Sequence, residues 1–212
     1  MEVLALLPPR EERGLGVWFK EAYVKDSLRL LWLRLLAFAL DYVVISLYLA
    51  LLVVVSFVVA RTDAGPGFRA LFSGPNSAEL TAFLVLVLPV LLYFAVFESS
   101  PWQATWGKRV LGLRVETTRD ARVGFPRALW RNALKLIPWE LTHACLWRIP
   151  GWPLAPETPP LWITIGLSLV WVIVAIYALS LALSRSGQTL YDWLAGVRVI
   201  RAKDIAAHRM GA

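Results

Sequence analysis

Three stretches of this chain contain no charged residue and are almost entirely apolar. Each is near or above the length of roughly 20 residues at which an α-helix crosses the hydrocarbon core of a bilayer. Hydrophobic residues make up 58% of the chain, and they are clustered rather than spread. We therefore predict an all-α integral membrane protein with at least three transmembrane helices. The stretches are Tyr42–Ala60, Leu80–Phe97 and Leu161–Ser184.

A fourth span is harder to recognise, because the apolar segment Leu136–Trp147 is short and is interrupted by Pro138 and Glu140. The distribution of Lys and Arg argues for it. With four spans, 18 of the 22 basic residues lie on one side of the membrane and three on the other, as the positive-inside rule expects. Three spans would instead place the basic C-terminal segment outside. We expect four spans, the third short or tilted, at about residues 30–60, 79–98, 132–149 and 160–184.

This topology predicts a single membrane domain over residues 1–212 in the cell (inner) membrane, with the tails 1–29 and 185–212 in the cytoplasm. The net charge of +7 then reflects topology and not a nucleic-acid partner. Basic residues that recur every four positions predict a helix face lying on anionic lipid headgroups. These residues are Arg127, Arg131 and Lys135. One chain is too small to enclose a wide aqueous path, so we also expect a homodimer or larger homo-oligomer.

Few residues offer enzyme or metal chemistry. Cys145 is the single cysteine of the sequence, which excludes an intramolecular disulfide and leaves too few thiols for a metal site. The sequence also has no nucleophile elbow, HExxH motif or glycine-rich phosphate loop. We expect neither a cofactor nor a metal, and we do not expect an enzyme.

A small β element is expected at the cytoplasmic surface, from residues 111–125 and 194–201. Alternating apolar residues flank a turn at Thr117–Asp120, and this pattern predicts a short hairpin. The alternating residues are Leu111, Leu113, Val115, Val123 and Phe125.

Two segments that each follow an apolar span resemble one another. TWGKRVLGLRV begins at Thr105 and TLYDWLAGVRV at Thr189, and they share Thr, Gly, Arg and Val at equivalent positions. An internal repeat on one side of the membrane implies two parallel halves, spans one and two against spans three and four. At another equivalent position the copies carry Lys108 and Asp192, opposite charges that can pair across a pseudo-twofold axis.

The segment RLLAFALD, the block QATWGKRVLGLRV, Arg131 and the block QTLYDWLAGVRVI together resemble the RDD family of membrane proteins, over about residues 32–200. That family is named for one arginine and two aspartates, which the resemblance places at Arg34, Asp41 and Asp192. The resemblance implies a transport function, with sodium/proton exchange as one form of it.

Asp41 and Arg34 lie on one face of the first span, seven residues and roughly 10 Å apart along the helix. Arg34 leans toward the helix N-terminus, so we expect it to snorkel to the interface rather than contact a substrate. Asp41 stays at acyl-chain depth, where an unpaired charge costs about 3 kcal/mol, and it needs a polar partner from another span. It is either a proton or cation site or a structural bond that fixes helix packing.

Other charges lie near the membrane surfaces. Glu98 marks the inner end of the second span, and we expect Asp192 to form a cytoplasmic lock. The partners available to that lock are Lys108, Arg109 and Arg34.

Glu140 and His143 are three residues apart on a helix, so they can face one cavity and relay protons. The alternative is a hydrogen-bonded pair at the outer interface.

The sequence therefore predicts a membrane transporter that exchanges a proton and a small cation at a buried carboxylate. The alternative is a scaffold or accessory subunit that transports nothing and whose buried charges only hold helices together. The predicted ion pathway comprises Arg34, Asp41, Asp192, Glu140 and His143, and the predicted gate comprises Lys108, Arg109 and Glu98.

Overall fold

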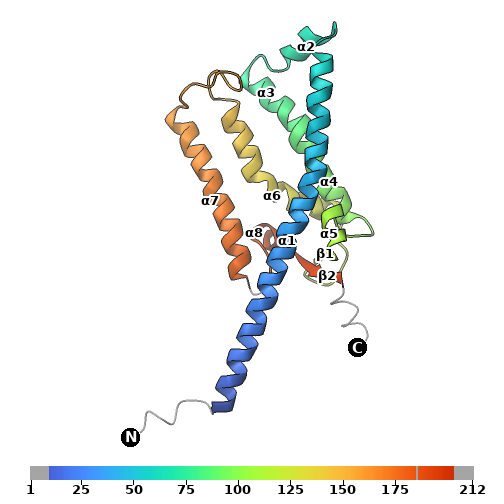
Figure 1. Cartoon of the computed structure of the whole chain (residues 1–212), viewed down its shortest axis with the longest axis vertical. Helices are drawn as coiled ribbons and strands as arrows, with labels where there is room; N and C mark the ends of the chain where they lie inside the picture. The colour runs from blue at the N-terminus through green and yellow to red at the C-terminus, as the bar shows by residue number, and fades with distance from the viewer. Residues whose placement is uncertain (1–9, 185, 203–212) are drawn as a thin grey trace.

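One long helix, α1 (Arg10–Val59), begins the described part of the chain. The computed structural model describes residues 10–184 and 186–202, with side chains from residue 29 onward. Most of the predicted N-terminal tail continues α1 without a break (Figure 1). The remaining parts of the two predicted tails, residues 1–9, 185 and 203–212, lie outside the described residues.

Three helical segments are long and apolar enough to cross a membrane, in agreement with the three uncharged stretches. They are Arg29–Val59 within α1, Pro75–Ser99, and α7 (Leu161–Leu183). Only 6% of the first apolar window and 0% of the last are buried within the protein, as expected of surfaces that face lipid. The second segment consists of α3 (Pro75–Ala82), the π-helical turn η2 (Phe83–Val87) and α4 (Leu88–Ser99), and the short α2 (Gly65–Ala70) precedes it.

A further long helix, α6 (Phe125–Leu146), has 22 residues and packs against both α4 and α7. Figure 1 shows it running between the two ends of the helix bundle, alongside α7. It begins seven residues earlier than the predicted third span at 132–149 and ends three residues before it. Four charged residues set α6 apart from the three apolar segments: Arg127, Arg131, Lys135 and Glu140.

Two prolines interrupt the backbone ladders of these helices, and a tyrosine compensates for each. Pro89 has no N–H to donate to the carbonyl of Val85, and Tyr48 of α1 donates to that oxygen instead, at 2.6 Å. In α6, Pro138 leaves the carbonyl of Leu134 free, and Tyr177 of α7 donates to it at 2.7 Å. Neighbouring helices therefore satisfy both carbonyls, as the low dielectric of a membrane requires.

A two-stranded antiparallel sheet lies at one end of the helices, beside the short helices α5 (Trp106–Val110) and α8 (Leu190–Leu194) (Figure 1). Its strands are β1 (Leu113–Thr117) and β2 (Val197–Arg201), paired in the register Val115 to Val199. The predicted β element is present, but the predicted hairpin is wrong. Only one isolated bridge joins Glu116 to Arg122, because β1 takes its partner from the second motif copy.

Both copies of the sequence repeat fold in the same way. Thr105 and Thr189 are the N-caps of α5 and α8, and a glycine with positive φ follows each helix, Gly112 at 65° and Gly196 at 62°. A strand then follows in each copy. Val115 and Val199 are equivalent residues and lie directly opposite each other in the ladder, so a local twofold axis relates the copies.

The buried face of the sheet closes this end of the bundle. It packs on small residues of the three helices above it, Ala37, Ala95 and Ala128, each at most 1% exposed. Small side chains allow the short helices and the sheet to approach the long helices closely.

Candidate functional site

Asp41 is 1% exposed, and each of its oxygens accepts hydrogen bonds from outside α1. Tyr93 of α4 donates to Oδ1 at 2.9 Å and Thr105 donates to Oδ2 at 2.6 Å. The backbone N–H of Gly107 donates to Oδ1 at 2.8 Å. As predicted, the partners of Asp41 come from another span and from the segment after it, and they are donors without formal charge.

The close approach of α5 to α1 depends on Gly107. A Cβ atom at this position would lie 2.2 Å from the carbonyl oxygen of Ala37, which real structures essentially never allow. The absence of a side chain therefore lets the first turn of α5 direct its N–H at Asp41. Thr105 has a second role there, because its Oγ1 also accepts from the N–H of Lys108 at the start of α5.

Five charged residues of alternating sign form a buried ion network near the sheet end of the bundle. Arg131 is at its centre: Nη1 donates to both oxygens of Glu98 at 2.7 Å, and Nε donates to Asp192 at 2.8 Å. Lys108 donates to the same Glu98 carboxylate. Arg34 donates to the other oxygen of Asp192 at 2.5 Å. The network thus joins α1, α4, α5, α6 and α8, and its net charge is +1.

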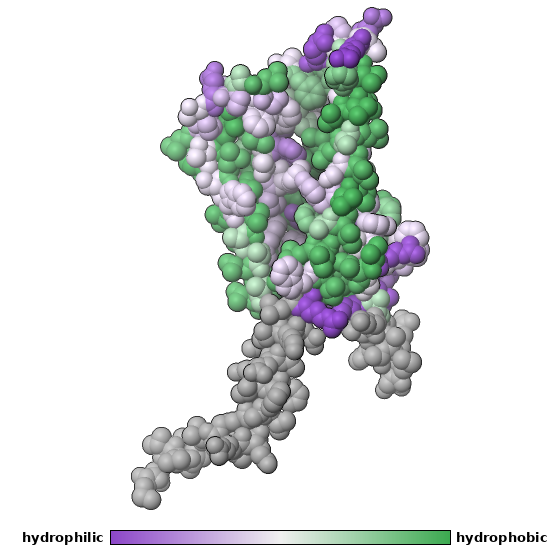
Figure 2. Space-filling model, viewed as in Figure 1, coloured by the Kyte–Doolittle hydropathy of each residue, from purple (hydrophilic) through white to green (hydrophobic). Residues whose placement is uncertain are grey.

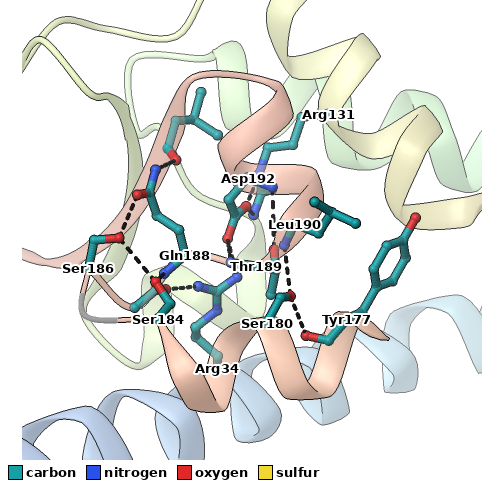
Figure 3. Close-up of polar contacts among 12 residues, drawn as sticks. Arg34, Arg131, Tyr177, Ser180, Ser184, Ser186, Gln188, Thr189, Leu190 and Asp192 are labelled. Carbon is teal, nitrogen blue, oxygen red and sulfur yellow. Dashed lines mark hydrogen bonds and ion pairs between the residues drawn. The ribbon is translucent and has the colours of Figure 1, made fainter. Parts of the chain in front are cut away.

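Figure 3 shows Asp192 between the two guanidinium groups, with Arg34 and Arg131 approaching from different helices. Arg34 also donates to the carbonyl oxygen of Gly187 at 2.5 Å. The N–H of Thr189 donates to Asp192 at 3.1 Å, which completes a capping box at the start of α8. Both oxygens of Asp192 are therefore saturated.

Two members of the network lie outside the apolar spans, and burial affects them in opposite ways. Burial by itself raises the pKa of Asp192, but the charges of Arg131 and Arg34 outweigh it and hold the pKa well below its usual range. Burial lowers the pKa of Lys108, and the attraction of Glu98 offsets only part of that effect. Asp192 is consequently fixed as an anion at neutral pH.

Several predicted placements are wrong. Arg34 is not a lone interfacial residue, because it forms an ion pair with Asp192. Lys108 does not pair with Asp192 across the pseudo-twofold axis, because it forms an ion pair with Glu98 instead. Arg109 lies outside the network, with its guanidinium 4.4 Å from the ring centroid of Trp102. Of the three partners considered for Asp192, the structure selects Arg34.

Glu140 and His143 lie farther along α6, away from the network. Within the described part of the chain no hydrogen bond or ion pair joins them, and Glu140 Oε2 and His143 Nδ1 are buried without a partner. The ring of His143 instead packs edge-on against Trp139, with centroids 5.3 Å apart. The predicted hydrogen-bonded pair is therefore not formed.

Sequence reasoning missed the central role of Arg131. The four-residue spacing of basic residues in α6 suggested a face on lipid headgroups, yet Arg131 is 1% exposed and only Arg127 is exposed. Asn132 was also missed, and its amide donates to Glu98 at 2.7 Å. The presence of Glu98 at the end of an apolar span was the one signal that a buried cation must lie nearby.

A pocket of about 310 Å³ lies between α1, α6 and α7, next to the network. Most of its wall is apolar. Its charged lining consists of Arg34, Asp41, Lys108, Arg131 and Lys135. In Figure 2 hydrophobic residues cover the two sides of the bundle, and paler and purple residues lie between them. The pocket thus connects a lipid-facing surface to the buried charges.

Comparison with known proteins agrees with this architecture. The model of the RDD family matches residues 28–158, which is more than half of the chain and includes Arg34, Asp41 and Arg131. The chain is also similar to Uncharacterized protein YxaI of Bacillus subtilis (strain 168), with 28% identity over 106 residues, 47% of this chain and 70% of that protein. No solved structure matches. The chain therefore belongs to the RDD family, whose members are membrane proteins.

Proposed function

We propose that the protein is a membrane transporter whose substrate pathway includes the pocket between α1, α6 and α7. The observation that carries this proposal is the 310 Å³ pocket itself, because it gathers five ionisable side chains, four of them on helices that we propose to span the membrane, around an accessible space. Each such residue costs about 2.5–3.5 kcal/mol at the centre of a bilayer. A protein that is only anchored in the membrane has no use for residues that make insertion less favourable, whereas a carrier needs polar groups along its substrate pathway.

Asp41 is the proposed proton acceptor of this transporter. It lines the pocket, and it accepts from Tyr93, Thr105 and Gly107. A protonated carboxyl group keeps less acceptor capacity than a carboxylate, so proton uptake would weaken the attachment of α5 to α1. Because α5 also carries Lys108, a proton at Asp41 would be coupled to the ion network and hence to the sheet end of the pocket.

A small cation is the less favourable co-substrate. Glu98 and Asp192 are already saturated by protein cations. A cation entering the pocket would also meet the four basic side chains of its lining, which repel it in a low dielectric. The electrostatics of the pocket therefore favour an anionic substrate over the cation that the sequence suggested.

We also propose that α6 is a fourth transmembrane helix. Because β1 and β2 are hydrogen-bonded partners, they lie on one side of the membrane, and the chain between them must cross it an even number of times. Since α7 is one crossing, α6 supplies the second, and its 22 residues extend over about 33 Å. The excess of basic residues near the sheet supports the further proposal that both termini lie in the cytoplasm, at the cell membrane.

The scaffold alternative is favoured by a different observation, the saturation of the ion network. Every carboxylate oxygen of Glu98 and Asp192 accepts from a cationic side chain, which suits a fixed structure as well as a closed gate. A bundle of four helices is too narrow for a wide aqueous path, so in either case we propose a homodimer or larger homo-oligomer as the working form.

Proton movement in liposomes that contain the purified protein tests the transport proposal. Gradients of sodium, potassium, lithium, phosphate and an organic carboxylate are imposed in turn, and an enclosed dye reports the lumenal pH. We expect wild type and the exposed control Asp63→Asn to move protons with at least one of these gradients, and Asp41→Asn to be at least tenfold slower per folded molecule. Stability alone does not separate the two functions, because Asp41→Asn also weakens three hydrogen bonds. Absence of flux with every gradient would favour the scaffold.

A further inference from the structure

Lys135 differs from the other basic residues around the pocket. Arg34, Lys108 and Arg131 all contact carboxylates. Within the described residues, no hydrogen bond or ion pair involves Nζ of Lys135, which instead lies 3.6 Å from the ring centroid of Phe94. Aromatic rings stabilise an ammonium group, but by less than a desolvated anion does.

The charge balance around the pocket is also incomplete. The five residues of the ion network carry a net charge of +1. Asp41 and Lys135 also line the pocket, and their charges are opposite, so the net charge of all seven groups is still +1. Asp41 does not neutralise Lys135 directly, since no ion pair joins them and the carboxylate already accepts from three other donors. One negative charge from outside the chain would balance the cluster.

The apolar part of the pocket indicates what carries that charge. Four lining side chains remain 40% to 49% exposed and form a rim on the lipid-facing surface of the bundle: Leu35, Phe38, Trp139 and Val174. The charged part includes Arg34, which pairs with Asp192 beyond the end of α7 and so lies near one end of the apolar helices. Lipid headgroups and the first carbons of their acyl chains occupy this depth. A small inorganic anion would leave the apolar rim uncovered.

We propose that this pocket binds one anionic lipid of the surrounding membrane, with its phosphate at Lys135 and the beginning of an acyl chain along Trp139 and Val174. Basic pockets between transmembrane helices recognise lipid phosphates through the same charge complementarity. The inference rests on the pocket that the proposed function uses and names its ligand class. It does not require flux, because bound lipid is measured on the protein at rest.

Native mass spectrometry of the full-length protein in a neutral detergent tests this inference, with phosphatidylglycerol and phosphatidylcholine added at equal concentration. We expect wild type to retain one phosphatidylglycerol with at least tenfold preference. Lys135→Met should lose this preference, whereas Arg127→Met, which removes an exposed charge of the same helix, should keep it. Equal retention of the two lipids by wild type, or an unchanged preference in Lys135→Met, would overturn the proposal.

Two further measurements cover the other outcomes. Val174→Trp places a larger side chain along the proposed path of the acyl chain without changing a charge. It should therefore also abolish phosphatidylglycerol retention, and it is decisive if Lys135→Met does not fold. Competition by millimolar glycerol phosphate that removes the bound lipid would show a site for a free anion and contradict the lipid assignment. Specific lipid retention without proton flux would refute the transport proposal alone, whereas flux without lipid retention would refute this inference alone.

Discussion

Replacing Arg131 by methionine should destabilise the protein more than any other single change in the ion network. The guanidinium of Arg131 donates to Glu98 and to Asp192 at 2.6–2.8 Å, and the residue is 1% exposed. After the substitution Glu98 keeps Lys108 and Asp192 keeps Arg34, but each buried carboxylate loses a charge-assisted partner. Removing one partner of a buried ion pair costs about 3–5 kcal/mol, and we expect the free energy of unfolding to fall by an amount in that range.

Equilibrium unfolding in mixed detergent micelles measures this loss, with Arg127→Met as the control. Arg127 lies one turn earlier in α6 and is exposed, so its substitution should change the free energy of unfolding by less than about 0.5 kcal/mol. Arg131→Lys should fall between the two, because an ammonium cannot bridge both carboxylates. Combining Arg131→Met with Asp192→Asn should cost less than the sum of the single changes. A loss below about 1 kcal/mol for Arg131→Met would refute the network as a source of stability.

The remaining predictions concern packing, freed carbonyls and pH. Gly107→Ala should lower the free energy of unfolding by about 2–3 kcal/mol through overpacking, while Gly67→Ala, with open space around it, should not. Tyr48→Phe and Tyr177→Phe should each cost about 1 kcal/mol in the same unfolding assay, because each leaves unbonded a helix carbonyl that a proline has already deprived of its N–H partner. The pKa of Asp192 is depressed in the folded state, so its stabilising effect is present above its usual value of 3.8 and is lost as the pH falls toward the folded pKa. Unfolding measured from pH 6 to pH 2 should show this loss in wild type and less of it in Asp192→Asn.

The apolar spans were predictable from sequence because length and hydropathy decide membrane insertion almost alone. The unbonded carbonyl of Val85 follows from Pro89 for a similar reason, since a proline always removes one backbone bond. The donor that satisfies this carbonyl was not predictable, because the contact between Tyr48 and the carbonyl of Val85 depends on how two helices are rotated relative to each other. Local rules thus give the elements and the unsatisfied groups, while tertiary packing decides which neighbour satisfies them.

The site shows the same division. The sequence indicated that Asp41 needs partners from elsewhere, and the structure supplies them. The hairpin prediction failed because alternating apolar residues indicate a strand but not the strand with which it pairs. The partner of β1 is the equivalent strand of the second repeat copy, β2. Arg131 was misplaced because a spacing of four residues defines a helix face without saying whether that face meets lipid or protein.

All of these proposals require α6 to cross the membrane beside α4 and α7, because the network and the pocket are built on it. The most direct test is a pair of reporters, one inserted after Ala155 in the loop between α6 and α7 and the other fused after Ala212. The account predicts that the reporter at residue 155 lies outside the cell and the one at residue 212 lies in the cytoplasm. Reporters on the same side of the membrane, or a C-terminus outside, would contradict the four-span arrangement and the function proposed from it.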